Sequence, residues 1–295
     1  MKVLVIGSTG KTGHELCMLL KEKNIPYDAP GRKELDLAYP EQIQSCLKHY
    51  KPDIVVNAAS YNNPGQAEIE PAYCFRINKD AVAEIADYCN RQGCILIQVS
   101  TYRIFDGIQS EPYSEQDTPN PSNVQAISRW QAEQEIHKRC ARHIILRLSW
   151  VISERRNNML AKLLDQLSCH QEVTVTSDQL GCPTPAEDAA RVIIAIIQQL
   201  DCGADVWGTY HYASTEAVSE NSFAEIVTLE ASHYHHLKVK KLKMNKMDNR
   251  KGVLPPANAN LDCSLILNTF GIHRRPWRTA LSKIIYSYFQ NTPFS

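Results

Sequence analysis

Residues 7–13 read Gly-Ser-Thr-Gly-Lys-Thr-Gly and follow directly after the strand-like run Lys-Val-Leu-Val-Ile at 2–6. In a loop with the spacing G-x-x-G-x-x-G, the first glycine allows a sharp turn and the second lets a pyrophosphate approach the backbone. The third lets the following helix pack on the sheet, and the amides and dipole at the helix N-terminus favour the phosphate charge. A strand, this loop and a helix in succession predict a site for NAD(H) or NADP(H), formed by Gly7, Thr9, Gly10, Lys11, Thr12 and Gly13.

The identity of the nicotinamide cofactor depends on the end of the second strand. An acidic residue about 20 residues beyond the loop binds the ribose hydroxyls in NAD-dependent proteins of this kind. The second strand is short, at 25–28, and ends in Asp28, with Arg32 shortly after it. Asp28 could accept a hydrogen bond from a 2′-hydroxyl, whereas Arg32 could accommodate a 2′-phosphate or lie free on the surface. We favour NADP(H) over NAD(H).

The N-terminal half alternates continuously apolar runs with helical patterns. Such runs are typical of parallel strands that are buried on both faces, and the alternation predicts right-handed crossovers. We therefore expect an α/β fold with a Rossmann-type doubly wound parallel sheet. The expected strands after the first two lie at 53–57, 94–99 and 143–148, and the expected helices lie at 11–23, 40–50, 66–92 and 122–141.

Beyond residue 150 the alternation becomes looser, and Gly-, Pro- and Asn-rich loops separate the helical patterns. We expect residues 1–150 to form the dinucleotide-binding domain. Residues 151–295 would form mainly a smaller C-terminal α/β substrate lobe, with some later segments returning to the first domain. The helices expected in this part lie at 155–169, 185–201, 219–231 and 277–290.

The composition is that of an ordinary globular protein, with 43% hydrophobic and 22% charged residues among 295. The formal net charge is zero, which favours neither a nucleic-acid partner nor an anionic membrane. We find no signal-peptide pattern and no apolar run near the ~18–20 residues that span a bilayer, so we expect a cytoplasmic protein. The segment 238–251 holds seven Lys or Arg residues and one Asp, and we interpret it as a solvated strand or loop.

The cysteines and histidines do not form a metal-binding pattern. Ten cysteines are spread from Cys17 to Cys263, and none of them forms a C-x-x-C pair. Free cysteines pack as small hydrophobic residues in a reducing compartment. The best metal candidate is the cluster 233–236, which contains three histidines, but adjacent side chains point in different directions. We predict no metal site.

A series of short motifs runs in order through nearly the whole chain. After the glycine loop the motifs are ELDL at 34–37, NAASY at 57–61, AE at 67–68, EP at 70–71, Asn78, ST at 100–101, FDG at 105–107, PY at 112–113, RLSWV at 147–151, Asn158, DQLGCPT at 178–184 and PWR at 276–278. In that order they resemble the motifs of the dTDP-4-dehydrorhamnose reductase family of extended short-chain dehydrogenases. The resemblance implies an NAD(P)H-dependent reduction of a 4-keto sugar on a nucleotide, a nucleotide-sugar ligand, and either a homodimer or a partner protein.

The resemblance also implies roles for individual residues. Contacts with the cofactor are implied for residues that follow the strands, with the first two near the adenine: Asp36, Leu37, Ala58, Ala59, Tyr61, Asn78 and Ser100. Contacts on the sugar-nucleotide side are implied for Glu68, Trp150 and Asn158. The two alanines could instead only permit close packing, and Trp150 could belong to the core.

The residues that carry the family's chemistry are altered. The family reduces a ketone with a hydroxyl residue and Tyr-x-x-x-Lys, in which the tyrosine, of ordinary pKa ~10, donates a proton with help from the lysine charge. The family pattern Asn-Val-Tyr-Gly-x-Ser-Lys here reads Asn-Val-Gln-Ala-Ile-Ser-Arg at 123–129. Gln125 therefore replaces the tyrosine and Arg129 the lysine, while Thr101 keeps the hydroxyl that orients the carbonyl. Tyr102, directly after it, could serve as a substitute acid.

A glutamine can donate a hydrogen bond but cannot deliver a proton at neutral pH, and loss of a general acid typically lowers a rate by ~10²–10⁴. We therefore expect an NAD(P)-binding reductase homologue in which binding is kept and standard catalysis is lost. The alternatives are an enzyme that uses a displaced acid, and a non-catalytic regulatory or scaffold subunit that binds NAD(P) and a nucleotide sugar. A redox-sensing regulator is a third alternative.

Overall fold

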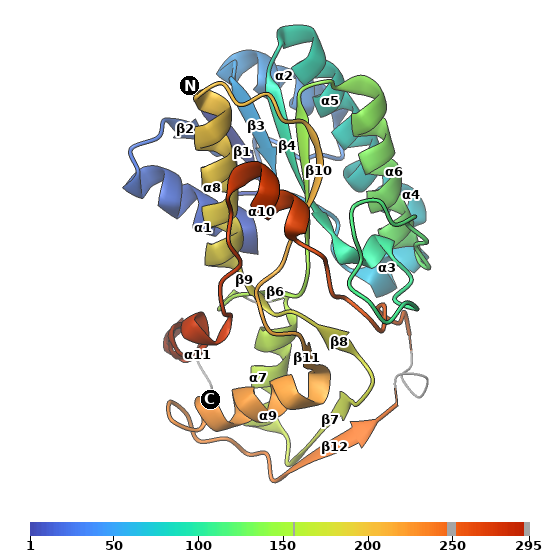
Figure 1. Ribbon diagram of the computed structural model, residues 1–295, viewed down its shortest axis with the longest axis vertical. Coiled ribbons are helices and arrows are strands. Elements are labelled where there is room, and N and C mark those ends of the chain that lie inside the picture. Colours follow the sequence, from blue (N-terminus) through green and yellow to red (C-terminus); the bar gives the residue numbers. More distant parts are fainter. Residues whose placement is uncertain (156, 247–251, 292–295) are drawn as a thin grey trace.

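The computed structural model describes residues 1–155, 157–246 and 252–291. Its centre is a sheet of six strands, all paired in parallel, in the order β10-β5-β4-β3-β1-β2 (Figure 1). The order changes direction between β1 and β3, which is the switch point where ligands bind in doubly wound sheets. The predicted Rossmann-type fold is therefore confirmed. The strands are β1 (Val3–Ile6), β2 (Tyr27–Asp28), β3 (Ile54–Asn57), β4 (Ile95–Thr101), β5 (His143–Leu148) and β10 (Gly208–Tyr212).

Helices cover both faces of this sheet. On one face α1 (Lys11–Glu22) packs against α8 (Ala186–Asp201), and on the other α5 (Ala81–Gln92) packs between α2 (Pro40–Tyr50) and α6 (Val124–Arg139) (Figure 1). Successive strand residues point to opposite faces. Accordingly Val3 and Val5 join one hydrophobic cluster, and Leu4 and Ile6 join the other. The continuously apolar strands of the sequence thus serve two cores at once.

The helix predicted at 66–92 is wrong as a single element. The chain forms α3 (Pro64–Ile69), α4 (Pro71–Phe75), a π-helical segment η1 (Arg76–Asp80) and then α5. Glu70 has φ −126° and ψ 61°, outside the helical region. Because Pro71 lacks an amide hydrogen and disfavours the α conformation of the residue before it, the helix is interrupted there.

The second part of the chain forms a lobe at the carboxyl edge of the sheet (Figure 1). Its parallel pair β7 (Glu172–Thr176) and β12 (Lys241–Asn245) packs with α7 (Met159–Cys169) and α9 (Glu220–Ala231). The remaining elements of this part are β6 (Val151–Ile152), β8 (Leu180–Gly181), β9 (Thr184–Pro185), β11 (Val218–Ser219) and α11 (Arg278–Asn291). In between, the chain returns to the sheet through α8, β10 and α10 (Ser264–Phe270), which packs on β10.

The basic segment at 238–251 is partly a strand. Its residues in β12 are mostly exposed, and Lys243 pairs with Glu172 at 2.5 Å. Residues 247–251 of that segment lie outside the described residues. No helix in the described part of the chain is long and apolar enough to cross a membrane.

Candidate functional site

The glycine loop leaves no room for a side chain at Gly7 or Gly13. Gly7 has φ +85°, and a Cβ on it would lie 2.6 Å from the backbone nitrogen of Ala59. A Cβ on Gly13 would lie 2.2 Å from the carbonyl oxygen of Gly7. The loop therefore touches both α1 and the segment after β3. Gly10 caps α1 without a side chain, so the first amides of the helix face the loop uncapped, an arrangement that suits an anion.

Besides Lys11 of the loop itself, three cations from other segments lie near this loop, namely Arg103, Arg155 and Lys162. Lys11 Nζ donates to the carbonyl of Asn157 at 3.2 Å, and Arg155 Nη1 donates to the carbonyl of Thr9 at 3.2 Å. Burial lowers the pKa of Lys11, and the nearby charges of Arg103 and Lys162 lower it further. Such a concentration of positive charge is unfavourable by itself and is relieved by an anion.

Of these cations, the predicted set contained only Lys11. Arg103 lies in the 3-10 turn η2 (Tyr102–Ile104), whereas Arg155 and Lys162 come from the second lobe. No spacing within the sequence links the second lobe to the glycine loop, so sequence reasoning had no signal for those two. We call Lys11, Arg103, Arg155 and Lys162 the cation cluster.

The residues expected near the adenosine are tied to one another. Arg32 donates from Nε to Asp36 at 3.3 Å and from Nη2 to the hydroxyl of Tyr73 at 3.0 Å. Asp36 also accepts from the amide of Ala38 at 3.0 Å, and Leu37 is buried. Asp28 instead pairs with Lys2 at 2.7 Å, just before the start of β1.

Asn78 fastens the segment after β3 to α6. Its Oδ1 accepts from the amide of Tyr61 at 2.7 Å, and its Nδ2 donates to the hydroxyl of Ser128 at 2.9 Å. The amide of Ala59 donates to Asn57 at 3.1 Å, which holds the alanine pair against Gly7. The predicted groove residues Ala58, Ala59, Tyr61 and Asn78 are thus brought together beside the loop.

The hydroxyl of Tyr61 is unsuited to proton donation. It donates to the carboxylate of Glu70. This hydrogen bond, with burial and the charge of Glu70, raises the pKa of Tyr61 to about 12.

Gln125 lies buried in the first turn of α6, with 2% of its surface exposed. Its Nε2 donates to Oδ1 of Asn62 at 3.0 Å, and its Oε1 has no hydrogen-bond partner among the residues that the structure describes. Glu68, which the resemblance placed near the substrate, accepts from the amide of Val124 at 2.8 Å at the start of the same helix. At the motif position of the family's acid, the carboxamide of Gln125 is therefore hydrogen-bonded to the carboxamide of Asn62.

Arg129 lies one turn further along α6 and is also buried. Its Nη2 donates to the carbonyl of Val99 in β4, and burial lowers its pKa to about 10, opposed by the charge of Glu133. The guanidinium thus fastens the helix to the sheet.

Thr101 ends β4 at the carboxyl edge of the sheet, and its Oγ1 accepts from the amide of Arg103 at 3.3 Å. Tyr102 turns inward and belongs to the main hydrophobic cluster, with 5% of its surface exposed. The hydroxyl predicted to orient a carbonyl is at the site, whereas the predicted substitute acid packs in the core.

A buried ionic network underlies this part of the site. Glu133 receives hydrogen bonds from Arg147, the shortest at 2.7 Å, and from the hydroxyl of Ser100. Arg147 Nη1 donates to His211 Nε2 at 3.1 Å, and His211 Nδ1 donates to the carbonyl of Tyr113 at 3.0 Å. Burial and the charge of Arg147 lower the pKa of His211 to about 3, so the imidazole is neutral. Ser100, which the resemblance placed at the cofactor, thus binds Glu133 within the protein.

Two residues expected near the sugar have structural contacts. Trp150 is 5% exposed, and a Cβ on Gly181 would lie 2.3 Å from its ring. Asn158 caps α7 by accepting from the amides of Leu160 and Ala161 at 3.0 and 3.2 Å. Its Nδ2 donates to the carbonyl of Ser153 at 2.9 Å. Trp150 therefore fits the alternative of a core residue.

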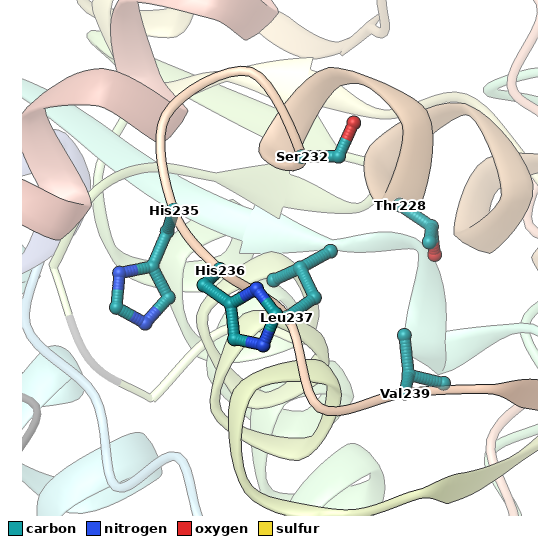
Figure 2. A pocket seen from close by; sticks show the side chains of 6 residues that line it. All are labelled: Thr228, Ser232, His235, His236, Leu237 and Val239. Carbon is teal, nitrogen blue, oxygen red and sulfur yellow. The ribbon is translucent and has the colours of Figure 1, made fainter.

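Two histidines of the 233–236 cluster, His235 and His236, line a separate hollow beside α9 (Figure 2). His235 stacks on Phe289 with ring centroids 4.6 Å apart, and Figure 2 shows its ring apart from that of His236. Within the described ranges no three His, Cys, Asp or Glu side chains are grouped so that they could hold a metal ion.

Comparison with known proteins agrees with the motifs. The family model described as the RmlD substrate binding domain matches residues 1–289. A dTDP-4-dehydrorhamnose reductase of Aggregatibacter actinomycetemcomitans is 31% identical over 288 residues, which cover 96% of this chain and 98% of the relative. The chain belongs to the dTDP-4-dehydrorhamnose reductase family. A family member from Sinorhizobium fredii is 30% identical over 287 residues, which cover 95% of this chain and 96% of the relative.

Solved structures of the family share the fold. The dTDP-4-dehydrorhamnose reductase of Bacillus anthracis, in complex with NADP, superposes with a TM-score of 0.85 at 25% identity and covers 99% of this chain and 98% of its own. A dTDP-4-dehydrorhamnose reductase of Clostridium acetobutylicum superposes with a TM-score of 0.88 at 24% identity, covering 97% of this chain and 98% of its own. The predicted family resemblance is confirmed, and the protein is a homologue of these sugar-nucleotide reductases.

Proposed function

We propose that this dTDP-4-dehydrorhamnose reductase homologue binds a nicotinamide dinucleotide and a nucleotide sugar but does not perform the family's ketone reduction at a normal enzyme rate. One observation carries the proposal. Buried Gln125, hydrogen-bonded to Asn62 at 3.0 Å, occupies the position of the family's proton donor, whereas the glycine loop keeps the geometry that a pyrophosphate needs.

Dinucleotide binding is supported by the loop itself. Gly7 and Gly13 allow the close approach of α1 and the segment after β3, and the first amides of α1, which have no side-chain cap, favour a pyrophosphate. The Bacillus anthracis relative was solved with NADP. When bound, the reduced dinucleotide would supply a hydride; the residues of this chain would hold and orient it.

We propose a preference for NADP(H) over NAD(H). Asp28, the acidic residue at the end of β2, is paired with Lys2. The guanidinium of Arg32 lies with Asp36, at the position that the family resemblance places beside the adenosine. A 2′-phosphate would find a positive charge there, and the exposed ion pair with Asp36 costs little free energy to rearrange.

Binding of a nucleotide sugar is supported by the cation cluster. The positive charges near Lys11 come from both lobes, so the diphosphate of a nucleotide sugar, like the pyrophosphate of the dinucleotide at the loop, would gain from lying near them. Thr101, at the carboxyl end of β4, offers a hydroxyl to a polar group of the sugar.

Loss of reduction follows because the candidate acids among the described residues are unsuited to donate a proton. Gln125 has no proton to deliver at neutral pH. Tyr102 is packed in the core and Tyr61 is held by Glu70 with a raised pKa. Arg129 binds the carbonyl of Val99 and so fastens α6 rather than lowering the pKa of a neighbouring tyrosine. A protein that binds without turnover suits a regulatory or scaffold subunit.

Calorimetric titration tests binding, and NADPH consumption tests chemistry. We expect NADPH to bind to the purified protein, dTDP-sugars to bind in its presence, and NADPH oxidation with dTDP-4-dehydrorhamnose to be slower by ~10²–10⁴ than in an intact family member assayed in parallel. Turnover equal to that of the family member, or no binding of any dinucleotide, would contradict the proposal.

A further inference from the structure

Two hydrogen bonds join the glycine loop to the segment that follows β6 in the second lobe. Lys11 Nζ donates to the carbonyl of Asn157, and Arg155 Nη1 donates to the carbonyl of Thr9, both at 3.2 Å. The partners in each bond are 146 positions apart in the sequence. Thr9 and Asn157 are exposed and Arg155 is half-buried, so a ligand in solvent can reach this junction between the lobes.

Arg155 is held in place by the turn that contains it. Its amide donates to Oγ of Ser153 at 3.2 Å, and Nδ2 of Asn158 donates to the carbonyls of Ser153 and Arg155. Asn158, which the resemblance placed beside the sugar, therefore braces this turn from its position as the cap of α7. The turn presents the guanidinium of Arg155 to the glycine loop from a fixed backbone.

The junction carries positive charge without a paired acid. Within the described part of the chain, none of the four residues of the cation cluster forms an ion pair with a carboxylate. Burial lowers the pKa of His14, in the first turn of α1, and the charge of Arg155 lowers it further. The first amides of that helix have no side-chain cap. The nearby charge and these amides both favour an anion.

We infer that Arg155 is the second lobe's ligand for the pyrophosphate of the dinucleotide, and that the dinucleotide thereby joins the two lobes. The inference rests on the proposed binding of a dinucleotide at the glycine loop. The hydrogen bond to Thr9 keeps the guanidinium at this loop, so Arg155 serves the dinucleotide rather than the sugar. A guanidinium forms charge-assisted hydrogen bonds with phosphate oxygens. In a protein without turnover, the dinucleotide is then a structural ligand that fixes the second lobe on the first.

Calorimetry with NADPH and NADH tests the contact, because both carry the pyrophosphate. Arg155→Met is expected to weaken the binding of both by the same factor, about 10-fold, and Arg155→Lys should recover part of the loss. Arg275→Met, at an arginine with 63% of its side chain exposed, is the matched control and should bind both normally. Unchanged affinity for both in Arg155→Met would overturn the inference and leave the proposed function in place. Failure of the natural protein to bind either dinucleotide would overturn both.

Hydrogen exchange tests the joining of the lobes. NADP⁺ should slow amide exchange in α7 of the natural protein, and should leave it unchanged in Arg155→Met at the same fractional saturation. Asn158→Ser keeps a residue type that caps helices well but loses the donor to the two turn carbonyls. It should therefore reduce dinucleotide affinity and the protection of α7 together. Equal protection of α7 in Arg155→Met and the natural protein would contradict the joining of the lobes.

Discussion

The two halves of the site differ in what they require of side chains. At the glycine loop, Gly7 and Gly13 leave no space for a Cβ, and the first backbone amides of α1 have no side-chain cap. At the first turns of α6, Gln125 and Arg129 are buried and hydrogen-bonded to protein atoms. The comparison teaches that the backbone geometry for a dinucleotide and the side-chain chemistry for a reduction are separable, although both lie along one sheet edge.

The largest effect is expected where α6 is anchored to the sheet. Glu133→Gln removes the carboxylate that binds Arg147 and Ser100, and Arg147 would remain buried and uncompensated. We expect the free energy of unfolding to fall by about 3–5 kcal/mol, measured by urea denaturation.

The control is Glu135→Gln, which weakens the partly exposed pair with Arg139 on the same helix. It should cost no more than about 1 kcal/mol. An equal loss of unfolding free energy in the two variants would show that the buried network of Glu133 does not hold α6 more firmly than an exposed ion pair does.

A second substitution tests the glycine loop. Gly13→Ala places a Cβ 2.2 Å from the carbonyl of Gly7, so the loop must move. We expect the loss of measurable NADPH binding by calorimetry and a destabilisation of about 1–3 kcal/mol. Gly31→Ala, where a Cβ meets nothing within 4 Å, should bind NADPH normally. Normal NADPH binding by Gly13→Ala would contradict the view that dinucleotide binding depends on the backbone geometry of the glycine loop.

A third change sharpens the cofactor preference. Arg32→Ala should weaken NADPH binding about tenfold, roughly one charge-assisted hydrogen bond, and should leave NADH binding unchanged because NADH lacks the 2′-phosphate. The ratio of the two dissociation constants is the readout. Arg91→Ala, at an exposed position on α5, is the control. An unchanged ratio in Arg32→Ala would remove Arg32 from the account.

The smallest effect is a dependence on pH. Burial and neighbouring cations lower the pKa of Lys11 below its ordinary value of 10.5, so Lys11 loses its charge at a lower pH than a free lysine. As pH rises through that lowered pKa, NADPH binding should weaken a few-fold. The dissociation constant in Lys11→Arg should stay flat over the same alkaline range, since arginine remains charged. Parallel curves for the two proteins would contradict this role.

Local patterns in the sequence predicted the glycine loop and four of the long strands, because each depends on neighbouring residues. The sixth strand, β10, was missed because its residues Gly-Thr-Tyr-His-Tyr are not aliphatic; His211 is buried there by Arg147 and Tyr113, which are distant in sequence. The helical period of residues 66–92 continues across Pro71, so the period alone predicts one helix, whereas the proline interrupts it in the structure.

The candidate site was predicted less completely than the fold. The motif positions of Gln125 and Arg129 identified these two residues. Their hydrogen-bond partners, Asn62 and Val99, lie on other elements of the fold and could not be predicted in the same way. Arg155 and Lys162 approach the loop from the second lobe. Such contacts depend on how distant segments pack, and no spacing in the chain reveals them.

The central claim is that binding is kept and the family's chemistry is lost through two side chains. The most direct test compares NADPH oxidation with dTDP-4-dehydrorhamnose by the natural protein and by Gln125→Tyr/Arg129→Lys, after both are shown to bind NADPH. We expect the double variant to be faster by ~10²–10⁴, the usual contribution of a general acid. A natural protein that turns over as fast as the double variant, at a normal enzyme rate, would contradict the claim.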